Sequence, residues 1–175
     1  MAFSNVSDGD EKTIVLRHLM RRPELFAAAV DLVNDCGYFR DYPQYGILLA
    51  VLRDYWQTCR RLPGLDVYLH QVLDFVEAQG LPESNRNTLK YIVTRFYATE
   101  DFSDGFVECV LRQERQDYEA RRIANQIELR KDSDDILKVI RDAHQRLVVD
   151  PFRKLESSTA FKDIEGNMED TVKFK

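Results

Sequence analysis

The sequence predicts an all-α protein, built as a compact helical bundle, a long antiparallel αα-hairpin and a flexible C-terminal tether. Only seven glycines and five prolines occur in 175 residues, and this low content favours long regular elements over a loop-rich β fold. Apolar residues recur at intervals of three and four along most of the chain, which is the spacing of one buried helix face. The hydrophobic content of 44% supplies a core without disulfides or a metal.

The first part of the chain, residues 10–98, is predicted to fold as a globular bundle. Asp8 or Asp10 can cap its first helix, because a short side-chain oxygen there accepts a hydrogen bond from the helix start. Asp41 and Gln44 have the spacing of a capping box at the start of a later helix. That later helix has apolar residues on more than one side, so we expect it to be the central helix of the bundle.

Residues 103–149 are predicted to form the helical hairpin. Its first helix begins near Ser103 and runs uninterrupted by proline to about Lys131, so it would reach roughly 42 Å. Both helices carry a heptad-like stripe of small and apolar residues, and we expect these stripes to face each other in an internal seam. The predicted seam consists of Ala120, Ala124 and Ile127 on the first helix and Ile136, Ile140, Ala143 and Leu147 on the second. Residues 150–175 are read as a linker, and their abrupt end suggests a piece cut from a longer protein.

Apolar side chains also lie off the predicted seam. A hairpin that projects from a bundle covers only one side of each helix, so the remaining apolar side chains face water unless another subunit covers them. The residues predicted at such a subunit or partner interface are Leu111, Tyr118, Leu137 and Val148. We expect them to support a dimer of micromolar strength.

No motif in the sequence indicates catalysis. The phosphate-binding loop, the dinucleotide fingerprint, the zinc-protease helix and the serine-hydrolase elbow are all missing. Cys36, Cys59 and Cys109 are far apart and lack paired spacing, which favours reduced cysteines over a disulfide framework or a zinc site. We therefore predict no catalytic, cofactor-binding or metal site and no ATP hydrolysis by this chain.

The charge pattern also limits the partners. The chain has 25 basic and 30 acidic residues, a net charge of −5, which argues against a dedicated nucleic-acid-binding module. Arg17, Arg21 and Arg22 cluster around the end of the first helix. They either contact phosphates or an acidic partner weakly, or form a solvated helix end with favourably placed cations; the second interpretation is favoured. Neither a membrane-spanning run nor a signal peptide is visible, so the protein is expected in the cytoplasm.

The order of elements resembles the N-terminal domain of DnaB-type replicative DNA helicases, in particular the T-even bacteriophage branch. The resemblance covers about residues 11–155 and is one of pattern and order rather than of invariant motifs. The similar stretches are IVLRHLMRRPELFAAAVDLV, GYFRDYPQYGILLAVLRDYW, LPGLDVYLHQVL, ECVLRQERQDYEARRIANQI and DPFRKL.

The resemblance implies a non-catalytic domain of the primosome that acts in DNA replication. Such a domain forms a collar on the hexameric helicase through self-association and docks the primase, and a helicase loader is a further partner. It implies an ATPase domain beyond this chain, where ATP and Mg²⁺ would bind, and a bacterial host cytoplasm if the protein is phage-encoded. Two alternatives stay open: a stand-alone helical adaptor or helicase-loading regulator that grips one replication partner through the hairpin, and a small nucleic-acid binder using the three arginines.

Overall fold

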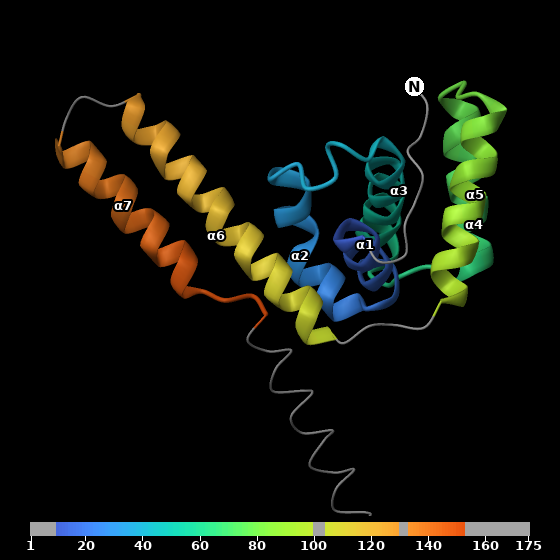
Figure 1. Ribbon diagram of the computed structural model, residues 1–175, viewed down its shortest axis with the longest axis horizontal. Helices are drawn as coiled ribbons and strands as arrows, with labels where there is room; N and C mark the ends of the chain where they lie inside the picture. Colours follow the sequence, from blue (N-terminus) through green and yellow to red (C-terminus); the bar gives the residue numbers. More distant parts are fainter. Residues whose placement is uncertain (1–9, 100–103, 130–132, 153–175) are drawn as a thin grey trace, which may run out of the picture. The chain divides into compact units, whose positions relative to one another are not determined.

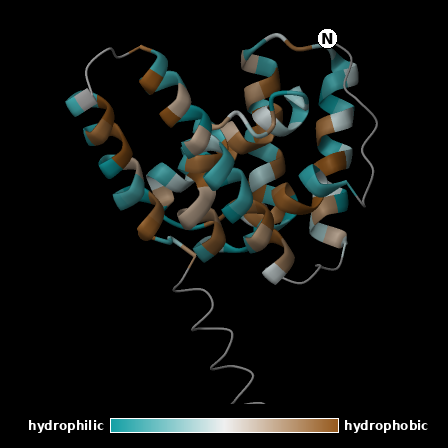
Figure 2. Cartoon of the chain, turned by 60° about the vertical axis from the view of Figure 1, so that its left-hand side comes forward, coloured by the Kyte–Doolittle hydropathy of each residue, from teal (hydrophilic) through white to brown (hydrophobic). Residues whose placement is uncertain are grey.

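The computed structural model describes residues 10–99, 104–129 and 133–152. Within these ranges the chain forms seven α-helices and no strand, which confirms the all-α prediction (Figure 1). The helices are α1 (Glu11–Arg21), α2 (Pro23–Asp35), α3 (Pro43–Cys59), α4 (Leu65–Ala78), α5 (Glu83–Ala98), α6 (Asp104–Glu128) and α7 (Ser133–Val148). Hydrophobic and hydrophilic segments alternate along them, as expected of amphipathic helices (Figure 2).

The chain divides into two compact units, and the boundary lies inside α6, between Cys109 and Val110. We call the first unit the head and the second the hairpin unit. The sequence placed the end of the bundle at residue 98 and the start of the hairpin at 103, so the observed boundary is later. The reason is that the first turns of α6 belong to the head, where Val107 is fully buried. The predicted linker of 150–175 lies, from residue 153 onward, outside the described residues, as does the predicted helix start at Ser103.

The most deeply buried helix of the head is α1. Every residue from Thr13 to Met20 is buried, including the polar side chains of Arg17 and His18. The sequence predicted α3 as the central helix, but the second half of α3 is half-buried or exposed from Arg53 onward. The apolar spacing predicted α3 as the central helix because the apolar face of α3 is wide. It did not predict α1, because α1 also buries polar residues, which an apolar pattern assigns to the exposed side.

One of the two predicted helix caps is present in the structure and the other is not. Asp10 accepts a hydrogen bond from the backbone nitrogen of Lys12 at 3.2 Å, so the predicted cap of α1 is confirmed. The predicted capping box of α3 is wrong, because α3 begins at Pro43 with Tyr42 as the N-cap and no side-chain cap bond. Asp41 therefore lies one position too early, and Gln44 is fully buried instead.

Buried tyrosine hydroxyls tie the head helices together. The hydroxyls of Thr13 and Tyr45 lie 2.6 Å apart and join α1 to α3. Tyr68 on α4 is fully buried and donates to the backbone oxygen of Leu48 on α3 at 2.6 Å. Burial raises the pKa of Tyr68 well above its ordinary value, because the phenolate would lose its solvation. Tyr68 therefore keeps its proton and its hydrogen bond over the physiological range.

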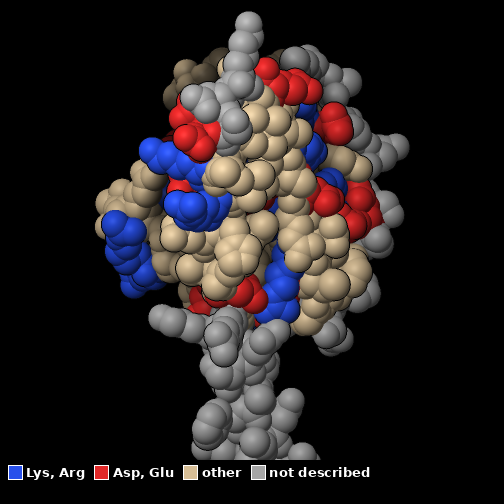
Figure 3. Space-filling model, turned by 90° about the vertical axis from the view of Figure 1, so that its left-hand side faces the viewer, with Lys and Arg blue, Asp and Glu red and all other residues tan. Residues whose placement is uncertain are grey.

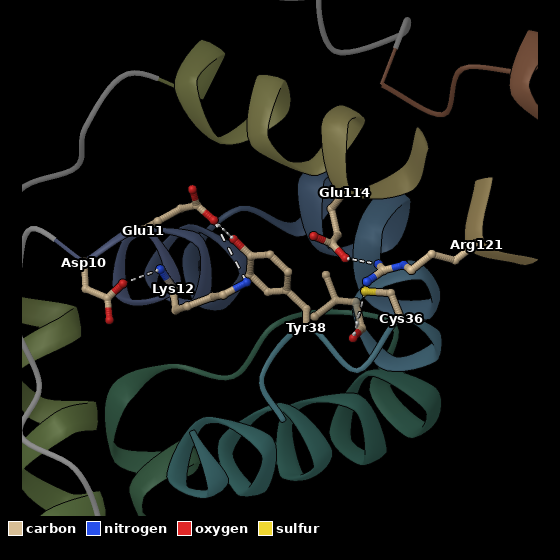
Figure 4. Close-up of polar contacts among 8 residues, drawn as sticks. Asp10, Glu11, Lys12, Cys36, Tyr38, Glu114 and Arg121 are labelled. Atoms are coloured by element: carbon tan, nitrogen blue, oxygen red, sulfur yellow. Dashed lines mark hydrogen bonds and ion pairs between the residues drawn. The ribbon is translucent and has the colours of Figure 1, made fainter. Parts of the chain in front are cut away.

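The connection between α2 and α3 is held to α1 by Tyr38 (Figure 4). Its hydroxyl donates to the Glu11 carboxylate at 2.8 Å, and the Lys12 ammonium lies 3.1 Å from the centre of its ring. The ring itself is buried and packs edge-to-face against Phe39. These contacts place two aromatic residues of the connection, Tyr38 and Phe39, in the core of the head, where they serve packing.

Candidate interaction surface on the hairpin unit

The hairpin unit pairs the second part of α6 with α7 in antiparallel orientation. Arg112, early in this part of α6, contacts Asp150 just after the end of α7, with 3.2 Å between its Nε and the Asp150 Oδ2. Further along α6, Glu119 accepts from Arg146, which precedes Asp150 in sequence. Positions that increase along α6 therefore meet positions that decrease along α7. The predicted antiparallel pairing of these two helices agrees with these contacts.

A polar cluster and two small apolar residues form the contact between the helices. Glu119 is buried. Its carboxylate lies 3.1 Å from the Arg146 Nε and 3.6 Å from the Arg122 guanidinium. Val139 and Ala143 are buried on the same face of α7 as Arg146, since they lie seven and three residues before it. Because Arg146 contacts α6, this face of α7 is turned toward α6.

The base of the hairpin unit is closed by the segment after α7. The Arg112 guanidinium lies 5.9 Å from the centre of the buried Phe152 ring, and the Phe152 backbone nitrogen donates to the Asp150 carboxylate at 2.9 Å. Arg115 donates to the backbone oxygen of Arg146. On α6, Glu114 and Arg121 form an ion pair at 2.9 Å, as Figure 4 shows. Contacts of Arg112, Arg115 and Arg146 thus link α6 to α7 and to the segment after it.

The structure corrects the predicted seam. Ala143 is buried as expected, and Ile127 and Ile136 are half-buried. The other four predicted seam residues are exposed: Ala120, Ala124, Ile140 and Leu147. Both helices are rotated by about one position from the prediction, so that Glu119 and Val139 lie where Ala120 and Ile140 were expected. A heptad pattern drawn from apolar residues alone passed over Glu119 because it is charged.

The predicted interface residues divide in the same way. Leu137 and Val148 are exposed, and Tyr118 is half-buried. Leu111 is fully buried, so its assignment to an exposed surface is wrong. It lies one helical turn after the buried Val107 and continues the same face of α6.

One face of α7 carries apolar side chains that nothing in the described chain covers. We call it the α7 stripe, and its members are Leu137, Ile140, Leu147 and Val148, with exposed fractions of 57%, 47%, 39% and 67%. Steps of three, seven and one residues keep all four on one side of the helix. Figure 3 shows one face of the molecule in space-filling form, where an uncharged area runs between basic and acidic side chains. The first turn of α7 is acidic, with Asp134 and Asp135, and its last turn is basic.

The predicted arginine cluster does not form one surface patch. Arg17 is fully buried, so its assignment to a phosphate or acidic partner is wrong. Arg21 is half-buried and donates to the backbone oxygen of Thr99 at 2.7 Å, while Arg22 is exposed. Arg17 and Arg21 lie on α1, which is buried on most sides, and Arg22 follows its end, so their closeness in sequence does not bring them to a common face.

The described ranges show no sign of a metal site, a disulfide or a membrane span. No three His, Cys, Asp or Glu side chains there lie where they could share a metal ion, and the three cysteines form no disulfide with one another. No helix among the described residues is long and apolar enough to cross a bilayer. Comparison with known proteins finds no matching family model, no matching curated protein and no matching solved structure.

Proposed function

We propose that this chain is a non-catalytic assembly module that associates with a second copy of itself through the α7 stripe. The observation that carries the proposal is the row of four apolar side chains on α7, each more than a third exposed. Isolated exposed apolar residues are ordinary on protein surfaces, but a row of them along one helix face is typical of a protein–protein contact.

The dipole of α7 favours a second copy as the occupant. An antiparallel pair of α7 helices places the N-terminal end of each copy beside the C-terminal end of the other. The same arrangement opposes the two helix dipoles, which is favourable. Such a two-fold interface uses the same patch on both copies, so the α7 stripe alone supplies both sides.

The expected affinity is modest. Burial of apolar surface contributes roughly 25 cal/mol per Å², so four partly exposed side chains on each copy give several kcal/mol. Loss of translational and rotational freedom offsets much of this gain. A dimer with a dissociation constant of about micromolar strength is therefore expected.

The role we propose for this dimer follows the resemblance to the N-terminal domains of DnaB-type replicative helicases. In that role the module contributes to a collar of a hexameric assembly and docks the primase or a loader, while ATP hydrolysis belongs to a separate ATPase domain. The fold supports the proposal in its general form, because a helical head followed by an αα-hairpin is the architecture that the resemblance implies.

Sedimentation velocity over about 1 to 300 µM tests the proposed self-association. Wild type is expected to shift from monomer to dimer, and Leu137→Asp/Val148→Asp is expected to stay monomeric. Val67→Asp is the matched control, because Val67 is an exposed valine on α4 in the head. A monomer at every concentration would contradict self-association and favour the adaptor that binds one different partner. A dimer that persists in the double variant would show that the α7 stripe is not the dimer interface.

A further inference from the structure

A second surface lies entirely within the head. An open pocket of about 620 Å³ is bounded by the end of α1, the connection from α3 to α4 and the end of α5. Three arginines line it, together with apolar and aromatic residues: Arg21, Arg60, Arg61, Leu62, Pro63 and Tyr97. Among the described residues that line it, none is an aspartate or a glutamate. The pocket therefore combines positive charge with an apolar wall.

Two of these arginines are available to a ligand. Arg60 and Arg61 are exposed, and neither guanidinium makes a hydrogen bond or an ion pair with any described residue. Arg21 is held at the wall of the pocket by its hydrogen bond to the Thr99 backbone oxygen. Guanidinium groups bind carboxylates through paired, charge-assisted hydrogen bonds, which makes a carboxylate a suitable ligand for this arrangement.

The backbone of Arg60 points to a role for its side chain. Arg60 ends α3 in the left-handed conformation, with φ of 53° and ψ of 27°. In the described chain the other residues with positive φ are Gly37 and Gly80, which follow the ends of α2 and α4. Glycine adopts this conformation without the steric cost that a Cβ imposes. An arginine at such a position carries a conformational cost that glycine would avoid. We therefore expect the guanidinium of Arg60 to have a role that offsets this cost.

The apolar wall of the pocket is firmly positioned. The Tyr97 hydroxyl on α5 donates to the Pro63 backbone oxygen at 2.8 Å and fixes the α3–α4 connection. Burial raises the pKa of Tyr97 to about 12, so this hydroxyl keeps its proton at neutral pH. Pro63 and Met20 are themselves buried. A ligand would thus meet a wall that needs little rearrangement, which lowers the entropic cost of binding.

We propose that this pocket binds a short acidic peptide segment of a partner protein, with an apolar side chain placed between its carboxylates. The carboxylates would meet Arg60 and Arg61, and the apolar side chain would lie against Leu62 and Tyr97. A nucleic acid fits less well, because it needs a continuous basic surface and the chain carries a net charge of −5. The inference uses no residue of the hairpin unit and does not depend on the proposed dimer.

Fluorescence anisotropy with the full chain and a labelled DDLDD peptide tests the pocket. Three other probes accompany it: the amide analogue NNLNN, the apolar-free analogue DDSDD and a labelled oligothymidylate. The protein variants are Arg60→Gly and Arg61→Gln, with Arg86→Gln on α5 as the control, since Arg86 is an exposed arginine outside the pocket. Leu137→Asp/Val148→Asp is included so that pocket binding is measured separately from dimerisation.

We expect DDLDD to bind wild type, Arg86→Gln and Leu137→Asp/Val148→Asp with the same affinity. It should bind Arg60→Gly about tenfold more weakly, because one charge-assisted contact is lost. NNLNN and DDSDD should both bind more weakly than DDLDD. Arg60→Gly should melt at or above the wild-type temperature, because glycine suits the left-handed position. Equal affinity of wild type and Arg60→Gly, no binding of DDLDD, or tighter Arg60-dependent binding of oligothymidylate would each overturn the proposal.

Discussion

The head and the hairpin unit differ in how completely they bury their apolar side chains. In the head, Leu16, Phe26 and Leu52 come from three different helices, and all three are fully buried. In the hairpin unit, α7 buries Val139 and Ala143 but leaves Leu137 and Val148 mostly exposed. A bundle surrounds each apolar face with several neighbours, while a pair of helices offers each helix one neighbour only. The head can therefore complete its core within one chain. In the hairpin unit, Glu119 of α6 pairs with Arg146 of α7, and apolar surface is left for another molecule.

The largest expected contrast between the two units comes from truncating one apolar side chain in each. Phe26 is fully buried and packs edge-to-face on Trp56, with 5.4 Å between ring centroids. Phe26→Ala should therefore lower the free energy of unfolding by about 3–5 kcal/mol, through lost burial and a cavity. Leu137→Ala should change it by less than about 0.5 kcal/mol in dilute solution.

Urea unfolding followed by Trp56 fluorescence measures both variants, because Trp56 is the single tryptophan and lies in the head. Circular dichroism at the same concentrations reports on both units. Equal losses in the two variants would contradict the contrast between a closed core and an open face.

Alkaline pH is the next test, and it acts on the head. The pKa of Tyr97 is raised to about 12 and that of Tyr68 lies well above its ordinary value, in both cases chiefly by burial. Since the folded state favours the protonated phenols, their contribution is complete below the unfolded-state pKa of about 10 and is lost as pH rises through the folded values.

We therefore expect the head to lose stability progressively above about pH 10. Tyrosinate absorbance should report delayed ionisation of Tyr68 and Tyr97, with unfolding when they ionise. Tyr97→Phe should make the loss of stability with pH less steep. A stability that is constant up to pH 12 would contradict the assigned burial.

The smallest effect is expected at the polar contact within the hairpin unit. Glu119→Gln keeps the shape of the side chain but removes the charge that faces Arg122 and Arg146. Both arginines are partly exposed, so solvent screens the pair, and we expect a loss of about 1 kcal/mol that is confined to the hairpin unit. Glu128→Gln, an exposed glutamate on the same helix, is the control and should have no measurable effect. Backbone hydrogen exchange of α7 in dilute solution distinguishes the two variants, and a loss of protection in the head instead would contradict the assignment.

The sequence predicted the helical fold well because the spacing of its apolar residues indicates which side of each helix is buried. The start of α1 at Asp10 and the helices that follow Pro23 and Pro43 are local features, and residues near in sequence determine them. The burial of Arg17 and His18 is a tertiary property. It depends on helices that come later in the chain, and no local pattern reports it.

The candidate surface was predicted in part. Leu137 and Val148 are exposed as expected, because they lie off the most regular apolar spacing of α7. The rotation that buries Val139 and exposes Ile140 depends on Glu119 and Arg146, two charged residues that pair only once the helices meet. The pocket with Arg60 and Arg61 was missed, because it joins three segments that are far apart in sequence.

Hydrogen–deuterium exchange at low and high protein concentration tests most directly whether α7 is the surface that a second copy covers. The account predicts that amides in Ser133–Val148 gain protection as concentration rises through the micromolar range, while those of α1 to α5 stay unchanged. Leu137→Asp/Val148→Asp should abolish the gain. Protection of α7 that does not change with concentration, or a gain confined to the head, would contradict the account.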